Sequence, residues 1–205
     1  MKEYLIKKAV YLPDGNIDWN QIDFAEVNFS PWQDYASPYN TLAQVVYDGE
    51  GLYVHLQTDE RKLRAVNTEK NSIVCEDSCM ELFFSPDSND TRYFNIEINP
   101  LGTMLVYVSN GRDNFEHIEF DEETFNVKSV ITYDGWELYY KIPYSFIRKH
   151  FKNITDIMYG NFYKCGDKTY REHYGCWNPV EIEYPEFHCR QYFGKLIFED
   201  MEGFV

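Results

Sequence analysis

Hydrophobic and polar residues alternate with a period of two along much of the chain. In residues 93–99 the apolar side chains fall at even positions, whereas the polar side chains Asn95 and Glu97 fall at odd positions. Because successive side chains of a strand point to opposite faces, this alternation predicts a strand. Similar runs predict further strands at residues 51–56, 80–84, 103–108, 127–132, 136–142, 157–163 and 194–198.

Short turn signals separate these strands, as in the Tyr-Asp-Gly sequence at residues 133–135. Helical periodicity is confined to residues 144–151, where Pro143 suits the first turn of a helix. We therefore predict an all-β protein. The expected fold is a single antiparallel β-sandwich, jelly-roll-like, with a short helix near residues 144–151, and it forms one domain over residues 1–205.

Composition and charge narrow the classes of function. The 205 residues include 34 acidic and 19 basic side chains, for a formal net charge of −15. This charge repels phosphate, so we expect no nucleic-acid partner and no binding to an anionic membrane surface. With 44% hydrophobic residues the chain can form a core. If Met1 is the native start we expect a cytoplasmic protein, and if a leader was removed, an extracellular one.

The five cysteines are an odd number and do not form a disulfide pattern. Cys75 and Cys79 lie in a strand-like run, where four residues span about 13 Å, too far for a disulfide or a shared metal. Zinc ligands from distant segments remain an alternative to plain buried thiols, although close Cys-x-x-Cys spacing is lacking. That alternative set comprises Cys165, Cys176, Cys189, His173 and His188.

No sequence motif for a catalytic site is present, so no catalytic residue and no metal ligand is assigned. Pairs such as Glu76 and Glu81, or Glu97 across a strand pair, would suit a glycosidase if their separation were right. The acidic loop at residues 87–90 suits calcium, with a solvated turn as the alternative interpretation.

Seven motifs, in order along residues 15–199, resemble those of family 9 carbohydrate-binding modules. The motifs are residues 48–56 (DGEGLYVHL), 76–84 (EDSCMELFF), 93–103 (YFNIEINPLGT), 136–143 (WELYYKIP), 160–164 (GNFYK), 177–179 (WNP) and 187–194 (FHCRQYFG). The resemblance implies an antiparallel β-sandwich that binds a mono- or oligosaccharide without catalysis, in some members with structural calcium.

The resemblance also implies a sugar site with an aromatic clamp and polar groups for the hydroxyls. A pyranose has an apolar C–H face that stacks on a ring, and its buried hydroxyls need hydrogen-bond partners. The residues that match the family pattern, and that we expect to bind carbohydrate, are Trp177, Glu76, Asn95, Glu97, Asn161 and Tyr163.

Two departures from the family pattern affect this expectation. Residues 67–72 contain no aromatic side chain for the second clamp ring, so Tyr170 or Tyr174 would have to supply it. Arg190 replaces the motif's proline. Two alternatives to sugar binding stay open: a glycoside-active hydrolase that uses a carboxylate pair, and a module whose decayed sugar site serves protein interaction. The alternative for Trp177 is a ring buried in the core. The alternative for Asn95 and Glu97 is that they form the solvent-exposed face of a sheet.

Overall fold

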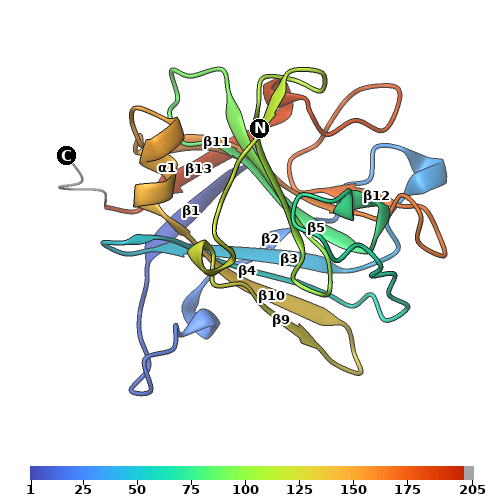
Figure 1. Ribbon diagram of the computed structural model, residues 1–205, viewed down its shortest axis with the longest axis horizontal. Coiled ribbons are helices and arrows are strands. Elements are labelled where there is room, and N and C mark those ends of the chain that lie inside the picture. The colour runs from blue at the N-terminus through green and yellow to red at the C-terminus, as the bar shows by residue number, and fades with distance from the viewer. Residues whose placement is uncertain (201–205) are drawn as a thin grey trace.

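In the computed structural model, which describes residues 1–200 apart from the side chain of Glu122, the strands form a curled mixed sheet whose two halves face each other (Figure 1). The first half contains β5 (Cys79–Ser85), β6 (Tyr93–Ile98), β7 (Met104–Ser109), β8 (Phe115–His117), β11 (Ile157–Cys165), β12 (Tyr174–Cys176) and β13 (Gly194–Phe198). The second contains β2 (Ala25–Glu26), β3 (Thr41–Tyr47), β4 (Gly51–Thr58), β9 (Lys128–Ile131) and β10 (Trp136–Pro143).

Helical structure is sparse. One α-helix, α1 (Tyr144–His150), begins directly after β10, as predicted, and inserts Phe146 and Ile147 into the core. Residues 1–200 also contain five 3-10 turns: η1 (Trp19–Gln21), η2 (Gln33–Tyr35), η3 (Val74–Glu76), η4 (Glu122–Thr124) and η5 (Arg190–Tyr192). None of the helices within residues 1–200 is long and apolar enough to cross a membrane.

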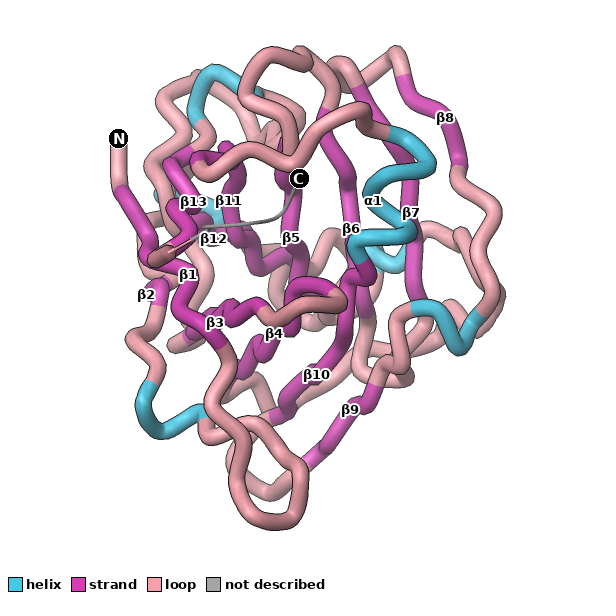
Figure 2. Tube along the Cα trace, turned by 90° about the vertical axis from the view of Figure 1, so that its left-hand side faces the viewer, coloured by secondary structure: helices cyan, strands magenta, loops and turns pink. Residues whose placement is uncertain are grey.

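The prediction of an entirely antiparallel sandwich is wrong at β1 (Glu3–Lys8). This strand pairs in parallel with β13, where Glu3 lies opposite Lys195, and in parallel with β3, where Lys7 lies opposite Val46. Figure 2 shows β1 between these two strands, where it joins the halves of the sheet. Tyr4 and Ile6 point into the core, so the N-terminal segment is a strand. The sequence does not reveal its direction, because alternation fixes the face of a strand and not its neighbour.

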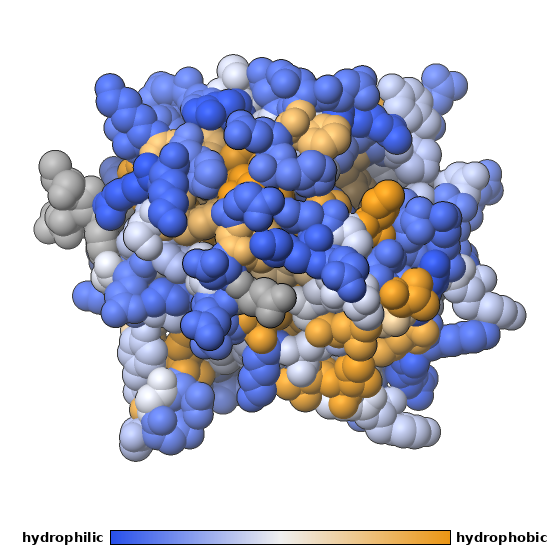
Figure 3. All heavy atoms as spheres, in the orientation of Figure 1, coloured by the Kyte–Doolittle hydropathy of each residue, from blue (hydrophilic) through white to orange (hydrophobic). Residues whose placement is uncertain are grey.

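The main core lies between the two halves of the sheet. The even positions of β5, β6 and β7, including Leu82, Phe94 and Val106, pack there against side chains of β3, β4 and β10. This arrangement follows directly from the alternation in the sequence, since every second side chain points inward. The face in Figure 3 is mostly hydrophilic, with apolar side chains visible near its upper centre and gathered in its lower part.

A second, smaller core covers the outer face of the first half. The odd positions of β5, β6, β7 and β11 point to it, and loops that contain Trp32, Val180 and Phe187 pack over them. The Nε1–H of Trp32 donates to the carbonyl of Ile182 at 3.0 Å and ties two of these loops together. The polar residues on this face are therefore buried, and Asn95 and Glu97 are not the wet face of a sheet.

Candidate functional site

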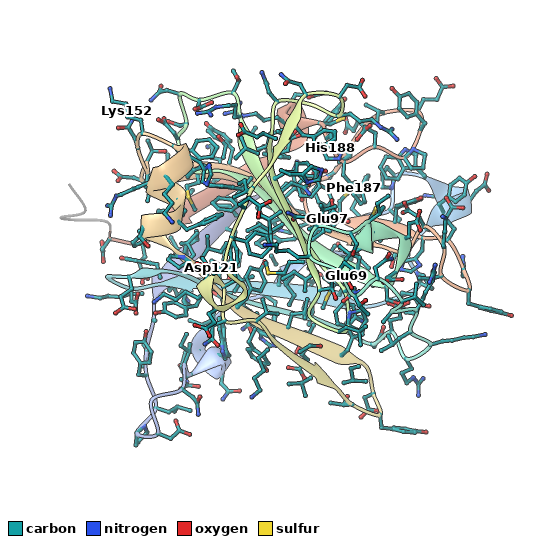
Figure 4. The ribbon with its side chains drawn as sticks, in the orientation of Figure 1. Glu69, Glu97, Asp121, Lys152, Phe187 and His188 are labelled. Carbon is teal, nitrogen blue, oxygen red and sulfur yellow. The ribbon has the colours of Figure 1, made fainter. Side chains whose placement is uncertain are left out.

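A cavity of about 450 Å³ opens on the outer face of β5, β6 and β7. Its floor is formed by strand residues, and its walls come from β8, from the segment that follows β11, and from the loop before η5. The floor includes Glu81, Glu97 and Cys165, and the aromatic walls include Phe83, Tyr107, Phe115, Tyr174 and Phe187. Glu97, Phe187 and His188 approach one another in Figure 4, in the region of this cavity.

Strand register brings two carboxylates together on the floor. Glu81 of β5 lies directly opposite Glu97 of β6, and Tyr163 of β11 lies opposite Glu81 on its other side. Side chains directly opposite each other in an antiparallel pair have Cβ atoms about 4.5–5.5 Å apart. Because their positions are odd, both glutamates point away from the main core and toward the cavity.

Each of these carboxylates has one oxygen without a hydrogen-bond partner. Asn95 donates to Oε1 of Glu97 at 2.7 Å, and the thiol of Cys165 donates to Oε1 of Glu81 at 2.7 Å. Oε2 of Glu81, Oε2 of Glu97 and Oδ1 of Asn95 meet no donor, although all are buried. An unpaired buried polar group costs about 1–3 kcal/mol, so the floor favours a ligand that donates hydrogen bonds.

Burial changes the titration of the pair. Burial raises the pKa of Glu97 to about 7, with the Asn95 hydrogen bond opposing the rise and the charge of Asp167 adding to it. Burial, reinforced by the nearby charge of Glu97, raises the pKa of Glu81 well above its usual range. Since the groups interact, they lose their protons as a pair, and the pair retains a proton near neutral pH.

Aromatic rings form the walls of the cavity. The ring of Phe187 stacks on that of Tyr163 with centroids 4.0 Å apart, and the hydroxyl of Tyr163 donates to the carbonyl of Phe187 at 3.2 Å. At the mouth, Phe115 is 50% exposed and its ring lies 5.2 Å from that of Tyr107. Tyr174 is half-buried and also lines the cavity. The walls therefore offer apolar faces beside the polar floor.

His188 holds one wall in place. Its Nδ1 lies 3.2 Å from the hydroxyl of Tyr93, and its Nε2 lies 3.3 Å from the hydroxyl of Tyr107. Burial lowers the pKa of His188, so the ring is neutral at pH 7. One of its nitrogens can therefore accept a hydrogen bond from a tyrosine hydroxyl. An ion pair at the rim, Arg112 Nη1 to Glu186 Oε2 at 2.8 Å, links two loops across the mouth.

The structure brings four of the six predicted sugar-binding residues to this face. Glu97 lines the cavity, Asn95 bonds to it, and Tyr163 supports Phe187. Asn161 has a positioning contact instead: it donates to the carbonyl of Asn178 at 2.9 Å, and its Oδ1 accepts from the Asn178 amide at 2.8 Å. Asn161 therefore fixes the loop that follows β12.

Trp177 and Glu76 lie elsewhere. Trp177 is only 4% exposed and packs edge-on against Tyr4 and Phe162 in the main core. A Cβ on Gly194 would come within 2.4 Å of the Trp177 ring, so the ring covers the space above that glycine. Glu76 forms an ion pair with Lys168 at 2.7 Å. The core interpretation of Trp177 therefore fits its position, and the clamp interpretation does not.

Other residues of the cavity were only weakly indicated by the sequence. Tyr174, a candidate second ring, lines the cavity, whereas Tyr170 is 83% exposed and stacks with the ammonium of Lys62 at 3.2 Å. Phe187 lies in a family motif and could have been found there. Phe115 begins the short edge strand β8, and Asp167 lies in the irregular segment after β11; the positions of both depend on tertiary contacts.

The acidic loop between β5 and β6 is held by hydrogen bonds within the protein. Asp87, which is buried, accepts hydrogen bonds from the Asn89 amide at 2.9 Å and from the Asn153 side chain at 2.8 Å. Both oxygens of Asp90 accept from Arg92. These contacts are those of a turn, and calcium binding by the loop stays a prediction.

The comparisons with known proteins agree with this geometry. The family model described as Carbohydrate-binding family 9 matches residues 12–198. A crystal structure from Bacteroides uniformis, described as a candidate carbohydrate-binding protein, is 29% identical with a TM-score of 0.85. It is matched over 97% of this chain and 99% of that one. No protein of curated function matches the chain.

Two more distant structures share the fold. Both are family 9 carbohydrate-binding modules from Caldicellulosiruptor kristjanssonii at 14% identity, one in complex with cellotriose and one with glucose. Their TM-scores are 0.69 and 0.68, over 100% of this chain and 97% and 99% of those chains.

Proposed function

The chain belongs to carbohydrate-binding family 9, and from this premise we propose that the cavity over β5, β6 and β7 is where it binds a saccharide without catalysis. The observation that carries the assignment is the pair of unpaired, buried carboxylate oxygens on the floor, Oε2 of Glu81 and Oε2 of Glu97. Because the pair retains one proton near neutral pH, one of the two groups is a charged carboxylate, to which a sugar hydroxyl donates well, and a bond to a charged group contributes about 1.5–3 kcal/mol.

The remaining surface of the cavity suits the other half of a pyranose. Phe115 and Tyr174 present ring faces on which the C–H face of a sugar can stack, in place of the clamp role expected of Trp177. A volume of about 450 Å³ lies within the range of small-molecule sites. Because family 9 modules of the same fold are in complex with glucose and cellotriose, gluco-configured sugars are the first ligands to test.

Titration calorimetry with glucose, cellobiose and cellotriose tests the proposal. We expect wild-type binding, and a loss of about 5- to 150-fold in affinity for Glu97→Gln, because one strong acceptor is replaced. Gln57→Ala, on the outer face of the second half, is the matched control and should bind like wild type. Absence of binding across the sugars, or equal affinity in Glu97→Gln, would contradict the site and favour a decayed module with an interaction role.

A second candidate function rests on the same carboxylates. Glu81 and Glu97 lie directly opposite each other, and together they retain one proton near pH 7. In this they resemble the acid and the nucleophile of a glycosidase. Turnover of an aryl glycoside that Glu81→Gln and Glu97→Gln both abolish would establish it. Binding of intact sugar without turnover would leave the non-catalytic function.

A further inference from the structure

A second chemical feature lies under the same cavity. Cys79 and Cys165 occupy opposite positions of the antiparallel pair β5 and β11, and Glu81 lies two residues farther along β5 on the same face. The two sulfurs and a carboxylate oxygen of Glu81 all lie within 4.8 Å of one another. Within residues 1–200 this is the one group of three metal-ligating side chains that converges in this way.

The group has a vacant donor and a route from solvent. All three side chains are at least 98% buried, and Oε2 of Glu81 has no hydrogen-bond partner. Glu81 and Cys165 line the cavity, so an ion that enters the cavity meets them directly. Cys75 also lines the cavity, and its carbonyl lies 3.8 Å from the sulfur of Cys165.

We propose that Cys79, Cys165 and Glu81 bind a thiophilic divalent cation of the zinc class at the floor of the cavity. Two thiolates with one carboxylate form a donor set that prefers zinc or cadmium to calcium or magnesium. Three protein ligands leave a fourth tetrahedral position, which faces the cavity and would take water or another small oxygen ligand. Binding releases the thiol protons to solvent, and the ion replaces them.

The surroundings of the cluster are acidic. The charges of Glu97 and Asp167 act on Glu81 more strongly than the ammonium of Lys164, which is fully buried on β11 and ion-paired with Glu60 at 2.8 Å. A divalent cation is therefore attracted to this floor, and with two thiolates and a carboxylate around it one negative charge would remain. The proposal does not depend on sugar binding, since the cation needs only the three side chains and access.

This site cannot be recognised from the spacing of the cysteines in the sequence. Cys75 and Cys79 suggest a pair but are separated along the chain, whereas the partner of Cys79 is Cys165, 86 positions later. The alternative zinc set with Cys176, Cys189 and His173 does not converge within residues 1–200. Instead Cys176 donates to the carbonyl of Phe29 at 3.5 Å, and His173 contacts Lys164 at 3.0 Å.

The test uses full-length, reduced, metal-free protein under anaerobic conditions. Cadmium alone is titrated while the ultraviolet charge-transfer absorption of cadmium thiolates is followed, and zinc affinity is measured by competition with a chromophoric chelator. We expect one ion per chain with two thiolates. Cys79→Ser and Cys165→Ser should each lower zinc affinity by at least about 100-fold, more than outer-shell partners typically cost. Glu81→Gln should weaken it without removing the thiolate absorption.

Cys176→Ser is the matched control, because it changes a buried cysteine of the neighbouring strand outside the cluster and should bind like wild type. A readout on unmodified protein covers variants that fail to fold: X-ray absorption spectroscopy of the zinc-loaded wild type should show two sulfur neighbours of the ion. The proposal is overturned if the wild type shows no thiolate absorption, if Cys176→Ser loses as much as Cys79→Ser, or if the bound zinc has no sulfur neighbour. Sugar titration in the presence of a chelator reports separately on the proposed function.

Discussion

Two hollows with similar side chains lie on opposite outer faces of this protein. One is the cavity over β5, β6 and β7, and the other is a larger groove of about 690 Å³ between Tyr11, Trp19 and β10. In the groove Glu137 accepts from His55 at 3.0 Å and from Tyr139 at 2.6 Å. In the cavity, by contrast, two glutamates each retain an oxygen without a donor.

The aromatic rings differ in the same way. In the groove, the ring of Tyr139 stacks on His55 with centroids 4.3 Å apart, and Trp19 lies against His55 at 5.3 Å. These rings are at least half-buried against each other, whereas Phe115, although its ring contacts those of Tyr107 and His117, is 50% exposed at the mouth of the cavity. The comparison teaches that unsatisfied polar atoms and exposed ring surface, rather than volume, distinguish a ligand site from a surface depression.

The largest expected effect concerns the core between the two hollows. Trp177→Ala should lower the free energy of unfolding by about 3–5 kcal/mol, because it empties a large buried volume. Urea unfolding measures this loss. Trp177→Phe, which keeps a ring, should recover much of the stability and bind sugar as wild type does. Normal stability with lost sugar binding in Trp177→Ala would restore the clamp interpretation.

The next effect is a pH dependence of stability that differs in sign between the two hollows: Glu97 in the cavity contributes a fall with rising pH, whereas His55 in the groove, whose pKa burial lowers, contributes a rise. Because burial raises the pKa of Glu97 from the usual 4.5 to about 7, the folded state retains a proton that the unfolded state has lost between these values. The contribution of Glu97 to the free energy of unfolding should therefore be largest below pH 4.5. It should fall by about 3 kcal/mol as pH rises to 7, and it should then level off.

Urea unfolding at intervals from pH 4.5 to 8 measures this slope. Glu97→Gln should reduce it and raise stability at pH 8, since the charge of Glu97 is then no longer buried, while Glu81, whose pKa is also raised, keeps its own share of the slope. An equal slope in wild type and Glu97→Gln would show that Glu97 titrates normally, and the contrast between cavity and groove would lose its electrostatic basis.

A smaller effect is expected in the groove. Glu137→Ala removes the acceptor of both His55 and Tyr139, and it should cost about 1–3 kcal/mol of stability, because these donors lose their partner. Sugar affinity should not change. Thermal unfolding and calorimetry on the same variant check the two statements, and weakened sugar binding would make the groove a ligand site as well.

The smallest effect concerns a single ring at the mouth of the cavity. Phe115→Ala should reduce sugar affinity by about 2- to 10-fold, since an aromatic contact contributes about 0.5–1.5 kcal/mol beyond area burial. Its stability should stay near that of the wild type, because Phe115 is half exposed. Tyr133→Ala, which removes an 86% exposed ring far from the cavity, is the control. Equal sugar affinities in both variants would show that Phe115 is not the stacking ring and would leave Tyr174 in that role.

The sequence alone was sufficient for most of the strands and for α1. Apolar and polar side chains alternate so regularly in residues 93–99 that the two-residue period of a strand predicts β6, its inward face and its polar face. The motif around residues 76–84 pointed to the family, and the resemblance to that family singled out Glu97 on the polar face of β6, where it lines the cavity.

Tertiary structure decided the rest, because it depends on which segments become neighbours. The parallel pairing of β1, the burial of Trp177 and the meeting of Glu81 with Glu97 all depend on register and strand order. Alternation fixes the face to which a side chain points, but it carries no information on what lies opposite. The sequence thus determined a β protein with a polar strand face, and only the fold turned that face into a buried floor with unpaired oxygens.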